Sequence, residues 1–153
     1  MSTREVVLCN PIRTPIGAFN GSLKGVPATE LGTVVVRETL KRSGLEADRL
    51  GSVIMGNVIQ AGNRMNPARQ AAIGGGVPVS VPAMTVNRVC GSGAQAIASA
   101  AQEIWLGHVD AAIAGGMENM DRAPYLMDGG RWGWECANRP LLARNSHIRP
   151  LKR

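Results

Sequence analysis

The sequence has few aromatic residues and no long apolar run. Phe, Trp and Tyr make up only 3% of its 153 residues, whereas 19 residues are glycine. The core must therefore be packed from Ala, Val, Ile and Met at close backbone approach. No stretch of about 18 or more apolar residues occurs, so we expect no membrane span and no membrane partner. Met1 leads directly into an apolar stretch without a signal-peptide core, which favours a cytoplasmic protein.

Paired cysteines and nucleotide-binding motifs are also absent. The three cysteines, Cys9, Cys90 and Cys136, show no CxxC spacing. This pattern argues against a zinc site and a disulfide framework, and it suits a reducing compartment. No GxGxxG follows the first apolar stretch, and no phosphate-binding loop ending in Gly-Lys-Ser/Thr is present. We therefore expect no metal site and no covalently bound cofactor.

The positive charge is concentrated at the C-terminal end. The formal net charge is +6, but residues 1–130 hold 11 basic and 10 acidic residues, and residues 131–153 hold six basic and one acidic. No basic patch interleaved with aromatic residues occurs in the main part of the chain. We therefore expect no nucleic-acid partner.

The segment 83–97 combines two hydrophobic patterns with a cysteine at their junction. Val86 and Val89 favour an extended, half-buried backbone. Gly91 and Gly93 permit close backbone approach and unusual dihedral angles. Apolar residues at helical spacing follow, namely Ala94, Ile97, Ala98, Ala101, Ile104 and Trp105. The pattern predicts a strand, a sharp turn and a helix, with Cys90 at or just before the start of that helix.

The position of Cys90 suits a nucleophile. Unpaired N–H groups and the positive end of the helix dipole favour a thiolate over a thiol at a helix start. The same N–H groups are suited to binding an oxyanion. The alternative is that Cys90 is a small buried hydrophobic residue, as free cysteines frequently are. The residues alone leave both interpretations open.

The rest of the chain predicts alternating strands and helices. We expect strands at Glu5–Cys9, with Cys9 in the core, at Val53–Met55 and at Asp110–Ala114, and helices at Ala28–Ser43 and from Asn66-Pro67 to Gly74. Such alternation predicts an α/β fold with a largely parallel sheet and right-handed crossovers. Ligand sites in such sheets lie at the carboxyl ends of the strands, which is where Cys90 follows its strand.

Two other residues are candidates for acid–base chemistry. Glu118 fits either a general base or a buried carboxylate that orders its loop, and we favour the second interpretation. His108 falls 18 positions after Cys90, beyond the far end of the same predicted helix. At about 1.5 Å per residue it lies roughly 25 Å away, too far to act as the base for Cys90.

Four blocks in order resemble the thiolase family. Asn87–Gly93 resembles the thiolase nucleophile segment, in particular that of the acetyl-CoA acetyltransferase type. Ala114–Met120 resembles the family's Gly-Gly-x-Glu-x-Met loop, and Pro11–Gly17 and Gly56–Val58 also fit. The resemblance runs from about Arg4 to Gly133. It is more specific than any single block, because the four occur at the family's spacing.

The resemblance implies a fold and a reaction. The fold is thiolase-like, with α/β/α layers and a mixed, mostly parallel sheet, and the chain corresponds to the amino-terminal half of a two-half fold. The implied reaction condenses two acetyl-CoA molecules to acetoacetyl-CoA, or runs in reverse as thiolysis, through an acyl-thioester on Cys90. Acyl-CoA thioesters are then the substrates, and family members form dimers or tetramers. The implied active-site scaffold is Asn87, Gly91, Gly93, Gly116, Met117, Glu118 and Asn119.

Several family motifs are missing from this sequence. The His that activates the nucleophile, the Asn and His that hold an oxyanion, and the Cys-x-Gly acid/base motif do not occur. We therefore expect the chain alone to be inactive or very weak. The alternatives are an inactive thiolase fragment that acts as a folding or assembly unit, and a degradative 3-ketoacyl-CoA thiolase. A ketoacyl synthase relative is disfavoured by the Gly-Gly-Met-Glu-Asn-Met block.

We divide the chain at Gly133. Residues 1–133 are expected to form an incomplete thiolase amino-terminal domain. Residues 134–153 form a divergent basic tail without helical or strand periodicity, for which we expect disorder. A shift of reading frame near Gly133 is the alternative explanation of this tail.

Overall fold

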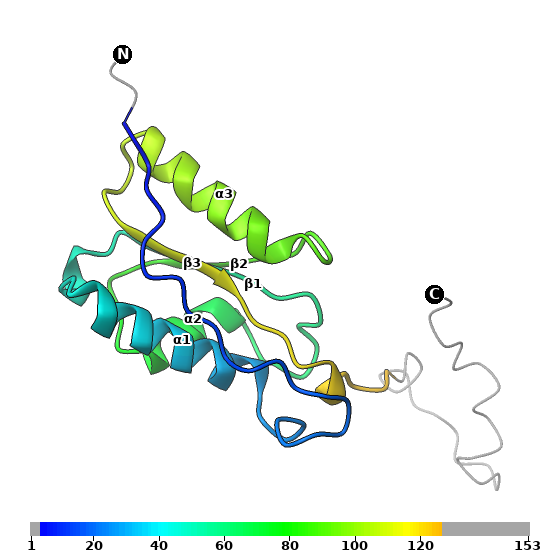
Figure 1. Cartoon of the computed structure of the whole chain (residues 1–153). Coiled ribbons are helices and arrows are strands. Elements are labelled where there is room, and N and C mark those ends of the chain that lie inside the picture. The colour runs from blue at the N-terminus through cyan, green and yellow to red at the C-terminus, as the bar shows by residue number, and fades with distance from the viewer. Residues whose placement is uncertain (1–3, 127–153) are drawn as a thin grey trace, which may run out of the picture.

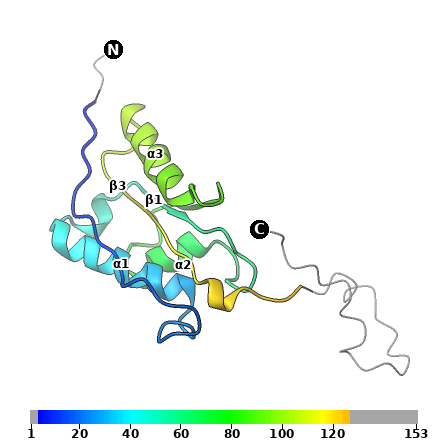
Figure 2. The same cartoon turned by 45° about the vertical axis from the view of Figure 1, so that its right-hand side comes forward.

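The computed structural model describes residues 4–126, which form a three-stranded parallel sheet between helices. The elements in chain order are α1 (Ala28–Ser43), the 3-10 helix η1 (Ala47–Arg49), β1 (Ser52–Gly56), α2 (Pro67–Gly74), β2 (Ala83–Val86), α3 (Ser92–Trp105), β3 (Ala112–Gly116) and the 3-10 helix η2 (Met120–Arg122). The strand order is β2-β1-β3. Helices α1 and α2 cover one face of the sheet and α3 covers the other (Figures 1 and 2). The predicted α/β/α layering is confirmed.

The helix boundaries follow local sequence signals. Helix α1 has the predicted bounds and ends at Gly44, whose φ of 64° is the left-handed conformation favoured by glycine. Helix α2 begins with Pro67, and the side chain of Asn66 accepts a hydrogen bond from the Arg69 N–H at 3.2 Å. This is the predicted N-cap, which satisfies one of the unpaired N–H groups at the helix start.

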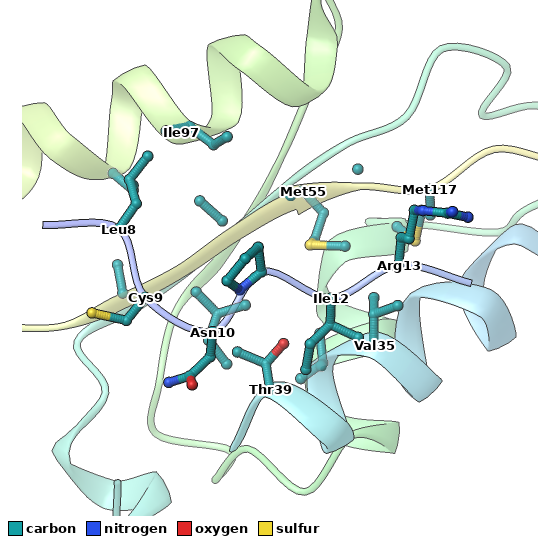
Figure 3. Close-up of a pocket in the computed structure, with 18 of the residues that line it drawn as sticks. Leu8, Cys9, Asn10, Ile12, Arg13, Val35, Thr39, Met55, Ile97 and Met117 are labelled. Atoms are coloured by element: carbon teal, nitrogen blue, oxygen red, sulfur yellow. The ribbon is translucent and has the colours of Figure 1, made fainter. Parts of the chain in front are cut away.

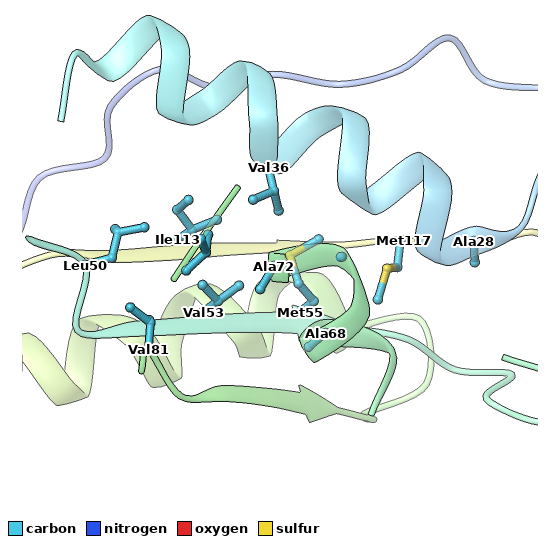
Figure 4. Close-up of a cluster of buried hydrophobic side chains, with 12 residues drawn as sticks. Ala28, Val36, Leu50, Val53, Met55, Ala68, Ala72, Val81, Ile113 and Met117 are labelled. Carbon is cyan, nitrogen blue, oxygen red and sulfur yellow. The ribbon is translucent and has the colours of Figure 1, made fainter. Parts of the chain in front are cut away.

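The core lies on both faces of the central strand. All five residues of β1 are buried, because β1 has a strand on each side and helices above and below. Towards α1 and α2, Val53 and Met55 pack with buried residues that include Val36, Ala68, Ala71, Ala72, Ile113 and Met117 (Figure 4). Towards α3, Ile54 packs with Ala96 and Ala100. The small residues let the helices lie close to the sheet.

The predicted first strand, Glu5–Cys9, is wrong. This segment forms no strand in the structure, and the side chains of Val7, Leu8 and Cys9 are exposed. The segment passes β3 without ladder hydrogen bonds within residues 4–126, and both line a cavity of about 490 Å³ (Figure 3). An apolar run becomes a strand only where a neighbouring strand pairs its backbone groups, and within residues 4–126 no strand pairs with this segment.

The strand expected at Asp110–Ala114 begins and ends two residues later, at Ala112–Gly116, because its register is set by pairing with β1. The tail 134–153, including Cys136, lies outside the described residues. Across residues 4–126, no helix is long and apolar enough to cross a membrane.

Candidate active site

The candidate site lies where the three parallel strands end. Because the strands run in the same direction, their carboxyl ends meet at one edge of the sheet. The loop after β1 begins at Asn57, the segment after β2 contains Asn87 and Cys90, and the segment after β3 contains Glu118. This edge therefore gathers most of the predicted site residues.

Cys90 lies on a tight turn between β2 and α3. Its side chain is exposed, and the next residue, Gly91, is the N-cap of α3. The Gly91 N–H donates to the Arg88 carbonyl at 3.1 Å, and the Ser92 N–H donates to the Val89 carbonyl at 3.0 Å. Cys90 is thus held within two overlapping turns directly before the helix, as the sequence predicts.

The buried side chain of Ser92 adds two hydrogen bonds to this turn. Its hydroxyl donates to the Val89 carbonyl at 2.6 Å, and its oxygen accepts from the Arg88 N–H at 2.8 Å. A hydroxyl can donate and accept at once, so this one gives the Arg88 N–H an acceptor and adds a second hydrogen bond to the Val89 carbonyl, which already accepts from the Ser92 N–H. Sequence reasoning missed Ser92. Its only signal is a hydroxyl residue at the first position of a predicted helix.

The unusual backbone conformation belongs to Val89, not to the glycines. Val89 has a φ of 49°, whereas Gly91 has a regular φ of −86°. β2 ends at Val86, so Val89 is not part of a half-buried strand, and its side chain is exposed. The expectations for Val89 and for the dihedrals of Gly91 and Gly93 are corrected accordingly. The chain reverses from strand to helix within a few residues, and this reversal overrides the extended preference of valine.

Close backbone approach occurs where α3 meets the strand ends. A Cβ on Gly56 would lie 2.6 Å from the Ser92 carbonyl carbon and 2.7 Å from the Gly93 nitrogen. A Cβ on Gly116 would lie 3.4 Å from the Gly93 Cα, whereas one on Gly93 itself would meet nothing closer than 4.0 Å. Of these three glycines, Gly56 has the strongest steric requirement, because its contacts are with backbone atoms below 3 Å. An isolated glycine ending a strand is the sequence signal of such an approach.

The start of α3 offers free backbone donors. Within residues 4–126, the N–H groups of Gly93 and Ala94 have no hydrogen-bond acceptor. They follow Cys90 by three and four positions, and Ala94 is exposed. Groups of this kind at a helix start bind negative charge, because the aligned peptide dipoles make the helix N-terminus positive.

The Glu118 carboxylate is occupied by the loop that follows β1. Its Oε2 accepts from the N–H groups of Val58 at 2.7 Å and Ile59 at 3.4 Å, and its Oε1 accepts from Asn57 Nδ2 at 3.1 Å. Asn57 is buried and also donates to the Met117 carbonyl at 3.1 Å. Glu118 therefore orders this loop, and three donors already engage its two oxygens.

The other predicted scaffold residues divide into two groups. Gly116 approaches the first turn of α3, whereas Met117 is buried beneath α1, where a Cβ on Gly32 would lie 2.5 Å from its sulfur. Asn119 donates to the Val26 carbonyl at 2.6 Å and to the Leu23 carbonyl at 3.0 Å, and so holds the loop before α1. Met117 and Asn119 support the fold away from the cysteine turn.

The 490 Å³ cavity is separate from the Cys90 turn. Cys9 lines this cavity and Cys90 does not. His108 is exposed beyond the C-terminal end of α3, at the opposite end of that helix from Cys90. Among the described residues, no group of three or more His, Cys, Asp or Glu side chains is arranged to hold a metal ion.

Fold and site together define a three-layer α/β protein with an exposed cysteine on a strand–turn–helix junction at the carboxyl edge of a parallel sheet. Residues 6–142 match the family model of the thiolase N-terminal domain. The chain belongs to the thiolase family.

Individual relatives agree with this assignment. The chain is 57% identical over 141 residues to a beta-ketothiolase of Cupriavidus necator, covering 92% of this chain and 36% of that protein. It is 49% identical over 139 residues to an acetyl-CoA acetyltransferase of Pseudomonas aeruginosa, covering 91% and 35%. The crystal structure of the Bacillus anthracis acetyl-CoA acetyltransferase superposes with a TM-score of 0.78 at 42% identity, covering 84% and 33%. The chain thus spans about a third of the length of these relatives.

Proposed function

We propose that this chain carries the acyl-accepting cysteine of a thiolase-type acyltransferase, and that Cys90 takes an acetyl group from acetyl-CoA. The observation that carries the proposal is the geometry of Cys90, which is exposed on a fixed turn beside the free N–H groups of Gly93 and Ala94. Relatives named acetyl-CoA acetyltransferase and beta-ketothiolase support the substrate class. In this proposal the complete reaction forms acetoacetyl-CoA from two acetyl-CoA molecules, or runs in reverse.

The acylation step needs only the Cys90 thiolate, the N–H donors at the start of α3 and water. The Cys90 thiolate attacks the carbonyl carbon of acetyl-CoA, and the carbonyl oxygen becomes an oxyanion within reach of donors at the start of α3. The bond between the carbonyl carbon and the coenzyme A sulfur then breaks. Coenzyme A leaves as a thiolate that takes a proton from water, and the acetyl group remains on Cys90 as a thioester.

Carbon–carbon bond formation needs further groups. A second acetyl-CoA must lose a proton next to its carbonyl before it attacks the acyl-enzyme, and an acid–base group typically contributes about 10²–10⁴-fold to such a step. His108 is at the opposite end of α3, and Glu118 is engaged by its loop. We therefore propose that residues 4–126 support acylation of Cys90 but only very weak condensation or thiolysis.

Two alternatives compete with this proposal. One is a degradative thiolase acting on longer 3-ketoacyl-CoA substrates, which the relative named probable acetyl-CoA acyltransferase keeps open. The other is an inactive assembly unit, which is favoured by the match to only about a third of the relatives' length. Acyl transfer to Cys90 distinguishes an enzyme from an assembly unit, and the relative rates with acetyl-CoA and longer acyl-CoA distinguish the two enzymes.

The experiment is acylation of the purified chain followed by mass spectrometry. After incubation with acetyl-CoA, we expect an acetyl adduct in the intact mass, located on Cys90 by peptide mapping. Cys9→Ser should leave the adduct unchanged and Cys90→Ser should abolish it. Equal labelling of Cys9 and Cys90, or no adduct at all, would defeat the proposal. Thiolysis of acetoacetyl-CoA, followed by absorbance, should be far slower than with a full-length relative.

The proposal also includes a cytoplasmic location and self-association into a homo-oligomer. Self-association is supported by large apolar side chains that are exposed in the described residues, among them Val79, Met65, Met84 and Trp105. Exposed apolar surface of this kind favours contact with another protein surface. Light scattering should show species larger than the monomer as concentration rises, and a monomer across a wide concentration range would contradict self-association.

A further inference from the structure

We propose that Asn87 is a positioning residue, which holds Val89 in its left-handed conformation and so fixes Cys90 at the start of α3. The inference rests on the proposed function, because it concerns the nucleophile of that reaction. Asn87 need not touch a substrate in this account. It acts through the backbone of the turn that carries Cys90.

The turn needs a restraint because of Val89. A β-branched residue at a φ of 49° lies in a region that only glycine, and to a lesser degree asparagine and aspartate, occupies readily. Such a residue persists only where its surroundings over-determine its conformation. The side chain of Val89 is 64% exposed, so packing of that side chain supplies little of the restraint.

Hydrogen bonds to the Val89 backbone provide the restraint from both sides. Its carbonyl accepts from the N–H and the hydroxyl of Ser92. Its N–H donates to Asn87 Oδ1 at 3.0 Å. The bond from a side-chain oxygen to the N–H two residues later is the pattern by which asparagine stabilises turns. Asn87 therefore fixes the entry to the left-handed residue and Ser92 fixes its exit.

The second bond of Asn87 ties this turn to the rest of the sheet edge. Asn87 Nδ2 donates to the Val58 carbonyl at 3.0 Å, and the Val58 N–H donates to Glu118 Oε2 at 2.7 Å. The relay thus joins the segments that follow β2, β1 and β3. Because Asn87 is exposed, these two hydrogen bonds, and not burial, determine where its amide points. These hydrogen bonds fix the position of the Cys90 turn relative to the ends of all three strands.

The test uses Val89→Gly as a partner mutation. Glycine adopts positive φ without a steric penalty, so a turn with glycine at this position does not need the bond from Asn87. If Asn87 acts by restraining Val89, then Asn87→Ala should impair Cys90 only when valine is present. A residue with a general structural role would cause the same loss with either residue at position 89.

The measurement is the rate of Cys90 alkylation by iodoacetamide, divided by the rate for the exposed Cys9 in the same molecule. We expect Asn87→Ala to lower this ratio about threefold to tenfold, mainly through loss of the bond to the Val89 N–H, because one neutral hydrogen bond contributes in this range. Val89→Gly alone should leave it near the unmodified value, and adding Asn87→Ala to Val89→Gly should change it by less than about twofold. Asn87→Ser should fall between, because serine reaches the Val89 N–H but not the Val58 carbonyl.

An unchanged ratio in Asn87→Ala, or an equal loss in both backgrounds, would overturn the inference. Urea unfolding of each variant shows whether it is folded, and Asn87→Leu, which also lacks the Oδ1 acceptor but has a similar volume, carries the comparison if Asn87→Ala does not fold. The readout separates the two proposals. Coupling between positions 87 and 89 without acetyl transfer to Cys90 would contradict the proposed function and support the restraint by Asn87. Acetyl transfer without coupling would support the proposed function and contradict the restraint.

Discussion

Glu118 and Asn87 bind the two backbone polar groups of one residue. The Val58 N–H donates to Glu118 Oε2 at 2.7 Å, and the Val58 carbonyl accepts from Asn87 Nδ2 at 3.0 Å. Glu118 follows β3, Asn87 follows β2, and Val58 follows β1. A single peptide segment thus connects the loop-ordering carboxylate to the turn that carries the cysteine.

Removal of the Glu118 carboxylate should destabilise the chain and loosen the Cys90 turn. Glu118→Ala leaves the Val58 N–H and the amide of buried Asn57 without this acceptor, and the expected loss is about 1–3 kcal/mol in the free energy of unfolding. Glu118→Gln keeps one acceptor oxygen and should lose less. Urea denaturation measures the free energy of unfolding of both variants, with Glu46→Ala, at an exposed glutamate, as the control. A Glu118→Ala variant as stable as Glu46→Ala would contradict the assigned loop contacts.

A methyl group on Gly56 should displace the start of α3. Its Cβ would lie 2.6 Å and 2.7 Å from backbone atoms of Ser92 and Gly93, which cannot move as a flexible side chain does. Overpacking of this kind costs about 1–3 kcal/mol, and Gly56→Ala should also lower the Cys90-to-Cys9 alkylation ratio. Gly25→Ala is the matched control, since its Cβ would meet nothing within 4 Å. Equal behaviour of the two variants in both measurements would show that the close approach is unimportant.

The cap of α2 should contribute measurably to stability. Asn66 accepts from the Arg69 N–H and from Thr85 Oγ1 at 2.8 Å, donates to the Ala83 carbonyl at 2.9 Å, and has a φ of 45°. We expect Asn66→Ala to lower the free energy of unfolding by about 1–2 kcal/mol. Asn66→Gly should cost less, because glycine tolerates the positive φ. Thermal unfolding compares the two, and a smaller loss for alanine than for glycine would be inconsistent with this explanation.

The helices and the layering were predictable because their signals are local. Asn66-Pro67 predicts the start of α2, Gly44 predicts the end of α1, and both hold in the structure. The position of Cys90 at a helix start was predictable for the same reason. A change from strand to helix periodicity within a few residues requires a junction, and the cysteine lies in it.

The features that failed depend on distant parts of the chain. Whether Glu5–Cys9 forms a strand is decided by a neighbour at the outer edge of β3, which no local pattern encodes. The left-handed conformation of Val89 opposes the preference of valine and is imposed by Asn87 and Ser92. The link from Glu118 through Val58 joins segments about 60 residues apart, so only the folded structure shows it.

The folded turn is expected to make Cys90 a nucleophile, and the most direct measurement compares the alkylation of Cys90 with that of two references. One reference is Cys9, which is also exposed but precedes no helix, and the other is a free peptide with the sequence of residues 87–93. Rates with iodoacetamide are measured by peptide mapping from neutral to alkaline pH. We predict that Cys90 in the folded chain reacts faster than both references at neutral pH, with the advantage over the peptide lost in urea. A rate for folded Cys90 equal to that of the peptide or of Cys9 would show that the turn does not activate Cys90.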